Sequence, residues 1–185
     1  GHFEGTSGES QRSKPTVNHE LIQDGENKTL GKRKINLETA KRWGYQYGKF
    51  KGKPVQIANY KNGDGHTIAQ KIRFPNKDFL FIGDTKAAGL YGQHLWRDGG
   101  KRVIVTEGEI DALSVSQLQN NKYPVVSVPN GAQGASRAIR KSITFLEKFE
   151  KVVFMFDMDD VGKDAALECG KLLSPGKAHI AHIDL

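Results

Sequence analysis

The chain has 185 residues, of which 37% are hydrophobic and 26% are charged, so it is long and apolar enough to bury a core. Lys and Arg outnumber Asp and Glu by 28 to 21, and this surplus favours a polyanionic partner such as nucleic acid or a nucleotide. A single cysteine, Cys169, excludes an internal disulfide and a cysteine-rich zinc site, so we expect no zinc in this fragment. No apolar run reaches membrane-spanning length and no signal peptide opens the chain, which predicts a cytoplasmic protein without a membrane partner.

Residues 1–30 are polar and rich in Gly, Ser, Asn and charge, with few aliphatic side chains. Such a composition buries too little apolar surface to offset the entropy of ordering, and it predicts a disordered linker. Asn36 has the side chain of a helix N-cap, and Gly44 has the freedom of a C-cap. We therefore predict a short helix between these two residues.

Residues 31–100 are predicted to form a small α+β subdomain. Alternating strands at 55–60 and 67–73 flank a turn-rich segment that contains Asn62-Gly63 and Asp64-Gly65, which is a hairpin signal. A third strand is predicted at 79–82, followed by an irregular connector.

Residues 101–185 alternate between short apolar runs and helical patterns. This rhythm is typical of a parallel sheet with helices on its faces, so we predict an α/β subdomain. The predicted strands are 102–106, 123–128, 151–156 and 178–183, and the predicted helices are 109–119, 136–148 and 162–173.

The order of the parallel strands follows from one proline. Pro124 cannot donate a hydrogen bond to a ladder, so its strand favours the edge of the sheet. Strands 102–106 and 151–156 then become neighbours in a 2-1-3-4 order, and their carboxyl ends meet at one edge. We therefore expect Glu107 to lie close to Asp157 and Asp159.

These carboxylates are the candidate catalytic and metal-binding residues. Asp157 and Asp159 point to the same side of an extended backbone, and oxygen ligands of this kind suit Mg²⁺, or Mn²⁺ in its place. Glu107 could be a metal ligand or the base that takes a proton from an attacking hydroxyl, and Asp111 is a further candidate one helical turn away. The alternative is that the Asp residues only cap helices and form turns. Glu109 is expected to be a first-turn charge that complements the helix dipole.

Basic residues are expected to face these carboxylates. Lys71 and Arg73 alternate on the predicted hairpin strand and share one of its faces, and Lys77 follows shortly after. They could contact nucleotide and template phosphates, or form an ordinary solvated face. Lys86 is a weaker candidate of the same kind. His94 is equally consistent with a template contact and with packing beneath the connector.

Two segments together carry a family resemblance. Residues Thr106–Asp111 and Phe156–Gly162 resemble the TOPRIM module, in which a Glu follows the first strand and an Asp-x-Asp follows the third. Over residues 31–185 the chain is most similar to the primase half of phage primase–helicases and Twinkle-type proteins.

The resemblance implies a Rossmann-like catalytic subdomain and template-directed synthesis of short RNA primers from ribonucleoside triphosphates on single-stranded DNA. It matches Lys71, Arg73 and Lys77 to the basic residues of the family that contact nucleotide and template. It also implies a zinc-binding domain upstream and a helicase domain downstream in the full-length protein, and the host cytoplasm if the protein is phage-encoded.

Two departures from the family pattern limit this comparison. No zinc-binding domain is present in the chain, and Asp184 is a poor substitute for a further acidic motif that the family carries past the last strand. Two other readings therefore stay open: a TOPRIM nuclease that uses the same carboxylates with water as nucleophile, and a non-catalytic module that only binds nucleic acid.

Overall fold

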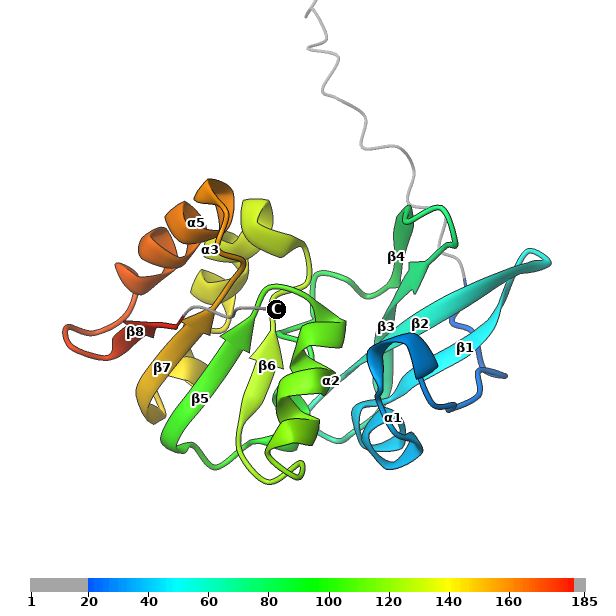
Figure 1. Ribbon diagram of the computed structural model, residues 1–185, viewed down its shortest axis with the longest axis horizontal. Helices are drawn as coiled ribbons and strands as arrows, with labels where there is room; N and C mark the ends of the chain where they lie inside the picture. Colours follow the sequence, from blue (N-terminus) through cyan, green and yellow to red (C-terminus); the bar gives the residue numbers. More distant parts are fainter. Residues whose placement is uncertain (1–19, 182–185) are drawn as a thin grey trace, which may run out of the picture.

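The computed structural model describes residues 20–181 and contains two four-stranded sheets that lie side by side (Figure 1). The first sheet is antiparallel in the order β1-β2-β3-β4, and the second is parallel in the order β6-β5-β7-β8. Both the predicted α+β subdomain and the predicted α/β subdomain with a parallel sheet are therefore confirmed. Within residues 20–181 no helix combines the length and apolar character that crossing a bilayer requires.

The antiparallel sheet follows one short helix. Asn36 caps that helix by accepting a hydrogen bond from the Thr39 amide, and Gly44 ends it in a left-handed conformation, as predicted. Strands β2 and β3 form the interior of the sheet. The elements of this half are η1 (Gly31–Arg33), α1 (Leu37–Trp43), β1 (Tyr45–Phe50), β2 (Lys53–Lys61), β3 (Thr67–Arg73) and β4 (Phe79–Gly83).

The predicted linker is wrong for the part of it that the structure describes. Glu26 pairs with Tyr47 through reciprocal backbone hydrogen bonds, so this polar segment extends the edge of the sheet. Ile22 exchanges hydrogen bonds with the Gln70 side chain, and Leu30 is buried. Composition missed this because backbone groups and three aliphatic side chains, Leu21, Ile22 and Leu30, make the contacts. The rest of the predicted linker lies outside the described residues.

The parallel sheet has the predicted 2-1-3-4 strand order. Its edge strand β6 is short, and Tyr91 of the connector pairs with Ser127 at its outer side. The connector therefore runs along the sheet edge and covers it. The elements of this half are η2 (Gln93–Leu95), β5 (Gly100–Thr106), α2 (Glu109–Leu118), β6 (Val125–Ser127), α3 (Gly131–Lys141), α4 (Ile143–Leu146), β7 (Phe149–Met155), α5 (Asp160–Gly170) and β8 (Ala178–Ile180).

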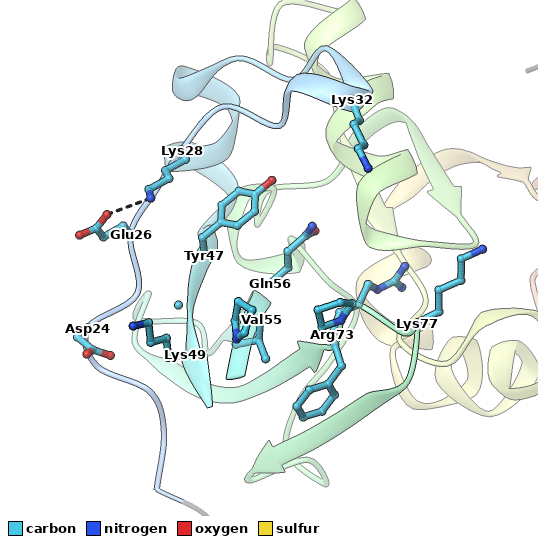
Figure 2. Close-up of a pocket in the computed structure, with 14 residues that line it drawn as sticks. Asp24, Glu26, Lys28, Lys32, Tyr47, Lys49, Val55, Gln56, Arg73 and Lys77 are labelled. Atoms are coloured by element: carbon cyan, nitrogen blue, oxygen red, sulfur yellow. Dashed lines mark ion pairs between the residues drawn. The ribbon is translucent and has the colours of Figure 1, made fainter. Parts of the chain in front are cut away.

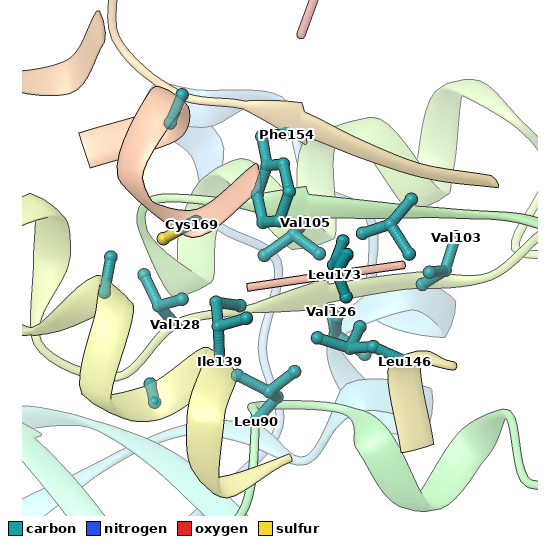
Figure 3. Packing of buried hydrophobic residues seen from close by; sticks show 14 of the residues in the cluster. Leu90, Val103, Val105, Val126, Val128, Ile139, Leu146, Phe154, Cys169 and Leu173 are labelled. Atoms are coloured by element: carbon teal, nitrogen blue, oxygen red, sulfur yellow. The ribbon is translucent and has the colours of Figure 1, made fainter. Parts of the chain in front are cut away.

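Helices cover both faces of the parallel sheet. Helix α2 lies on the face toward the antiparallel sheet, and α3 and α5 lie on the other face (Figure 1). Figure 3 shows Val105, Val126 and Phe154 of the strands packed toward this second helical layer. Cys169 is free and buried there, as its apolar helical surroundings lead one to expect. The predicted helix 136–148 is in fact two helices, α3 and α4, which meet at Ser142.

The two sheets share one hydrophobic core. Trp43 and Tyr60 from the antiparallel half pack in the same cluster as Ile104 and Leu113 from the parallel half. The Tyr91 hydroxyl donates to the Trp43 carbonyl, and its ring lies against those of Trp43 and Tyr60. A shared core of this kind holds the two halves in a fixed relation.

Gly92 is required where the connector passes Trp43. It has a φ of +83°, and a Cβ at this position would overlap the Trp43 ring. We expect Gly92→Ala to lower the free energy of unfolding by about 3 kcal/mol, because it adds steric overlap to left-handed strain. Gly52→Ala is the matched control, since Gly52 also has a positive φ of +78° but nothing lies near its Cβ position. It should cost only about 1 kcal/mol. Urea denaturation measures both losses, and equal losses would contradict the packing argument.

Candidate active site

Glu107 and Asp157 lie beside each other at the carboxyl edge of the parallel sheet. Strands β5 and β7 are neighbours, with Thr106 opposite Met155, so the residues that follow them project from the same edge. Burial, and then the neighbouring Asp157 carboxylate, raise the pKa of Glu107 to about 7. The Glu107 Oε1 atom is buried and has no hydrogen-bond partner. The expected meeting of these two side chains is therefore seen in the structure.

Asp159 lies at the same edge and is also the N-cap of a helix. Its Oδ1 atom accepts a hydrogen bond of 2.7 Å from the Gly162 amide and so caps helix α5. Its charge also contributes to the raised pKa of Glu107, which places it near that carboxyl. Asp157 and Asp159 are both exposed to solvent. The capping role and a place at the acidic edge coexist in this residue.

Asp111 faces the same edge from the first turn of α2. It is half-buried, and its pKa is raised by burial and by the Asp157 charge, while Arg33 acts in the opposite direction. The side chain thus lies within electrostatic reach of both an acidic and a basic neighbour. Of the predicted acidic residues, Glu107, Asp111, Asp157 and Asp159 are all brought together at one edge.

The acidic edge offers ligands that suit a hard cation. All of its donors are carboxylate oxygens, and the unpartnered Oε1 of Glu107 is a buried acceptor without a donor. Within residues 20–181, no group of three or more His, Cys, Asp or Glu side chains is already close enough to hold a metal ion. A cation that bound here would therefore draw the carboxylates together and would be completed by water or substrate oxygens.

Lys71 is not the free phosphate contact that the alternating pattern suggested. Only 7% of it is exposed, and its ammonium group forms an ion pair of 2.9 Å with Glu109. It also donates to the Pro129 carbonyl oxygen at 2.6 Å. The face of the strand was predicted correctly, but helix α2 covers that face and buries the charge.

Glu109 lies in the first turn of α2, as expected for a charge that complements the helix dipole. Its burial was not expected, because only 3% of it is exposed. The Tyr60 hydroxyl donates to its Oε1 atom at 2.9 Å, and Lys71 contacts both of its oxygens. No local signal marks its burial, because the side chains that contact it, Tyr60 and Lys71, come from the other half of the chain.

Arg73 and Lys77 are exposed and line a groove at the end of β3 (Figure 2). The groove has a volume of about 820 Å³. Figure 2 shows Tyr47 on one side of it and Arg73 and Lys77 on the other. Its charged lining residues are Asp24, Glu26, Lys28, Lys32, Lys49, Arg73 and Lys77, and we call it the Arg73 groove.

The Arg73 groove lies near the first turn of α2, the helix that follows Glu107. Lys71, two residues before Arg73 on the same face of β3, reaches Glu109 in the first turn of α2. The charges of Arg73 and Glu109 both act on the pKa of Tyr45, so all three lie in one neighbourhood. A phosphate-bearing molecule in this groove would therefore reach toward the carboxylates.

Lys86 and His94 lie away from the acidic edge. The backbone on either side of Lys86 accepts hydrogen bonds from Lys141, the last residue of α3, which runs toward the edge where the strands begin. His94 comes just before Trp96, whose indole donates to the Val125 carbonyl at the start of β6. The structure therefore does not bring these two predicted contacts together with the carboxylates.

The two halves of the chain match two known families. Residues 25–83 match the family described as "Bacteriophage T7 DNA helicase/primase, N-terminal a+b fold", and residues 104–184 match the family described as "Toprim-like". An α+β sheet followed by a TOPRIM sheet with acidic strand ends defines the catalytic domain of a DNA primase. TOPRIM domains typically bind a divalent metal.

Several proteins are similar over most of the chain. The DNA helicase/primase of Enterobacteria phage T3 is 40% identical over 158 residues, which cover 85% of this chain and 28% of that protein. The crystal structure of the primase fragment of the bacteriophage T7 primase–helicase is 37% identical, has a TM-score of 0.86, and is matched over 92% of this chain and 72% of that one. A structure of T7 lagging-strand DNA polymerase with primase domains bound to an RNA/DNA hybrid and dTTP contains a chain that is 39% identical, with a TM-score of 0.81. The match covers 87% of this chain and 82% of that one.

These similarities identify the family. The chain belongs to the phage T7-type helicase/primases and is their primase, or RNA polymerase, domain. It spans about a quarter of the length of the phage T3 relative, as the 28% coverage shows.

The buried Lys71–Glu109 pair predicts a large stability effect. Lys71→Met should lower the free energy of unfolding by about 3 kcal/mol, because it leaves a buried carboxylate without its counter-ion. Adding Glu109→Leu should recover more than about 1 kcal/mol of that loss, since the unpaired charge is removed as well. Urea denaturation measures both. Lys171→Met, which breaks the exposed Lys171–Glu168 pair, is the control and should cost less than about 1 kcal/mol. A double variant less stable than Lys71→Met would contradict the argument.

Proposed function

We propose that this domain synthesises short RNA primers from ribonucleoside triphosphates on a single-stranded DNA template, with Mg²⁺ at the acidic edge. The observation that carries the proposal is the convergence of Glu107 and Asp157 at one edge of the parallel sheet, together with a basic groove near the helix that follows Glu107. Primer synthesis needs carboxylates for the cation and positive charge for the triphosphate. Both are carried by two sheets that share a hydrophobic core.

Glu107, Asp157 and Asp159 are the proposed ligands of the cation. When bound there, Mg²⁺ would supply positive charge to the reacting phosphate oxygens. Glu107, whose pKa is raised to about 7, exchanges its proton near neutrality and is suited either to bind the cation or to take a proton from a hydroxyl group. Asp111 sits behind these residues and adds negative charge to the site.

Arg73 and Lys77 are the proposed phosphate contacts. Both are exposed at the mouth of the Arg73 groove, and neither forms an ion pair within the described part of the chain. Tyr47, half-buried in the same groove, offers a ring face on which a base can stack. Lys71 belongs to this proposal only as a residue that positions the groove, through its bonds to Glu109 and Pro129.

The natural protein is proposed to contain more than this domain. The phage T3 relative is a helicase/primase, and 72% of it lies outside the matched region, as the 28% coverage implies. We therefore propose a covalently linked helicase domain downstream, a zinc-binding domain upstream, and a host-cytoplasmic setting for the phage protein.

Primer synthesis tests the proposal directly. With single-stranded DNA, Mg²⁺ and labelled ribonucleotides, we expect short labelled RNA products. Asp157→Asn should reduce their rate of formation by at least about a hundredfold, because a ligand of the cation is lost. Asp160→Asn is the matched control, since Asp160 is an exposed carboxylate in the first turn of α5, and its rate should stay near that of the parent. Degraded template without RNA products would favour a nuclease, and binding without chemistry would favour a non-catalytic module.

The raised pKa of Glu107 predicts a pH-dependent response to Mg²⁺. Because the pKa of Glu107 is raised in the folded state, the free energy of unfolding falls as the pH rises. The folded protein then has to hold a negative charge in an unfavourable environment. Mg²⁺ offsets that charge, and it must first displace the proton at lower pH. The increase in melting temperature on adding Mg²⁺ should therefore be larger at about pH 8 than at about pH 6.

Differential scanning fluorimetry measures this response. In Glu107→Gln the increase should be smaller and should no longer change between the two pH values, because the titrating group has been removed. The same increase at both pH values in the parent protein would contradict the role given to Glu107.

A further inference from the structure

A second basic groove is lined by residues of both halves of the domain, and it shares no lining residue with the Arg73 groove. Its volume is about 540 Å³. The tip of the β2–β3 hairpin forms one wall, and α4 with Lys148, two residues after its end, forms another. We call it the Lys61 groove. Its basic lining residues are Lys61, His94, Arg97, Lys141 and Lys148.

The Lys61 groove lies toward the edge of the parallel sheet opposite the carboxylates. Lys148 comes immediately before β7 begins, whereas Asp157 follows the end of that strand. Trp96, next to Arg97, binds the Val125 carbonyl at the start of β6. A strand of seven residues, the length of both β5 and β7, spans about 20 Å. A ligand that fills one groove does not fill the other.

The charge of the Lys61 groove is entirely of one sign. No Asp or Glu lines it, and none of its basic side chains forms an ion pair within residues 20–181. Lys141 is held in place by the Ala88 carbonyl at 2.6 Å, which leaves its charge uncompensated. Uncompensated positive charges in a concave surface attract anions.

His94 supports this assignment. Its Nδ1 atom is buried and has no hydrogen-bond partner. Burial, followed by the charges of Lys61, Arg97 and Arg42, lowers the pKa of His94 to about 4. The cations that disfavour a charged imidazole here also generate a positive potential in the groove. A bound anion would reduce that potential and change the environment of the ring.

The chemistry of the lining selects phosphate groups rather than bases. The aromatic residue in the lining, Phe145, is only 7% exposed and offers no ring face for stacking. Asn62 and Thr144 add donors suited to phosphate oxygens. The groove has walls from both halves of the domain, as expected for a strand that passes across it. A free nucleotide would instead require a site for its base.

We propose that the Lys61 groove binds the phosphodiester backbone of single-stranded DNA at a second position, away from the catalytic edge. This inference rests on the proposed function, because a template strand is then the polyanion that the domain meets. With this groove included, the surface that binds DNA extends beyond the active site. Binding there is independent of base sequence and sensitive to salt.

The test is equilibrium binding of oligo(dT) without Mg²⁺, so that a failure of catalysis does not affect it. Fluorescence anisotropy compares a strand of about 5 nucleotides with one of about 20 nucleotides, since the shorter strand occupies only one groove. The Lys61→Ser/Lys148→Ser variant should bind the long strand about tenfold more weakly and lower the salt slope by about 1.4. Its affinity for the short strand should change by less than about twofold.

A control variant distinguishes loss of this site from a general loss of positive charge on the protein. Lys122→Ser/Lys171→Ser removes two exposed charges that line neither groove, and it should keep the parent affinity and salt slope. The ring resonances of His94 should shift with the long strand and not with the short one. Equal loss for the two strands, loss in the control variant, or unchanged binding of the long strand would overturn the proposal. If the Lys61→Ser/Lys148→Ser variant lost ATP binding as much as it lost binding of the long strand, the proposal would also be overturned, because the groove would then be a nucleotide site.

Discussion

The buried ion pair between Lys71 and Glu109 is the contact on which the working arrangement of this domain depends. Two opposite charges are removed from water together, and the Tyr60 hydroxyl and the Pro129 carbonyl satisfy their remaining hydrogen-bonding capacity. Lys71 comes from the antiparallel sheet and Glu109 from the first turn of α2. The pair therefore holds the strand that ends in Arg73 against the helix that follows Glu107, and it positions the basic groove beside the acidic edge.

Charge is sorted across the molecule in a way that suits a polymerase. Carboxylates are concentrated where β5 and β7 end, and burial together with the neighbouring Asp157 carboxylate raises the pKa of Glu107. Basic side chains line two separate grooves, and the chain as a whole carries a net charge of +7. A cation and a polyanionic substrate would each relieve the repulsion that the protein alone leaves uncompensated.

Much of the fold and of the acidic site could be predicted from local patterns. Pro124 indicated the edge strand, and the resulting strand order placed Glu107 beside Asp157. The errors arose wherever a side chain's surroundings came from distant residues. Lys71 and Glu109 each have an ordinary surface explanation in their own segment, and each is buried only because the other half of the chain covers it. Residues 20–30 have a polar composition, but their backbone pairs with an edge strand.

The sequence by itself determined most of the elements, the order of the parallel strands and the candidate carboxylates of the acidic edge, because periodicity, capping and turn signals act over a few residues. It did not predict strand β1, and it joined α3 and α4 into one helix. Only the tertiary structure decided which basic residues remain free for a ligand. Arg73 and Lys77 stay in solvent, Lys71 is neutralised in the core, and His94 lies in a separate groove. That choice depends on which surfaces the packed sheets cover, and burial of a charge is decided by contacts between residues far apart in the chain.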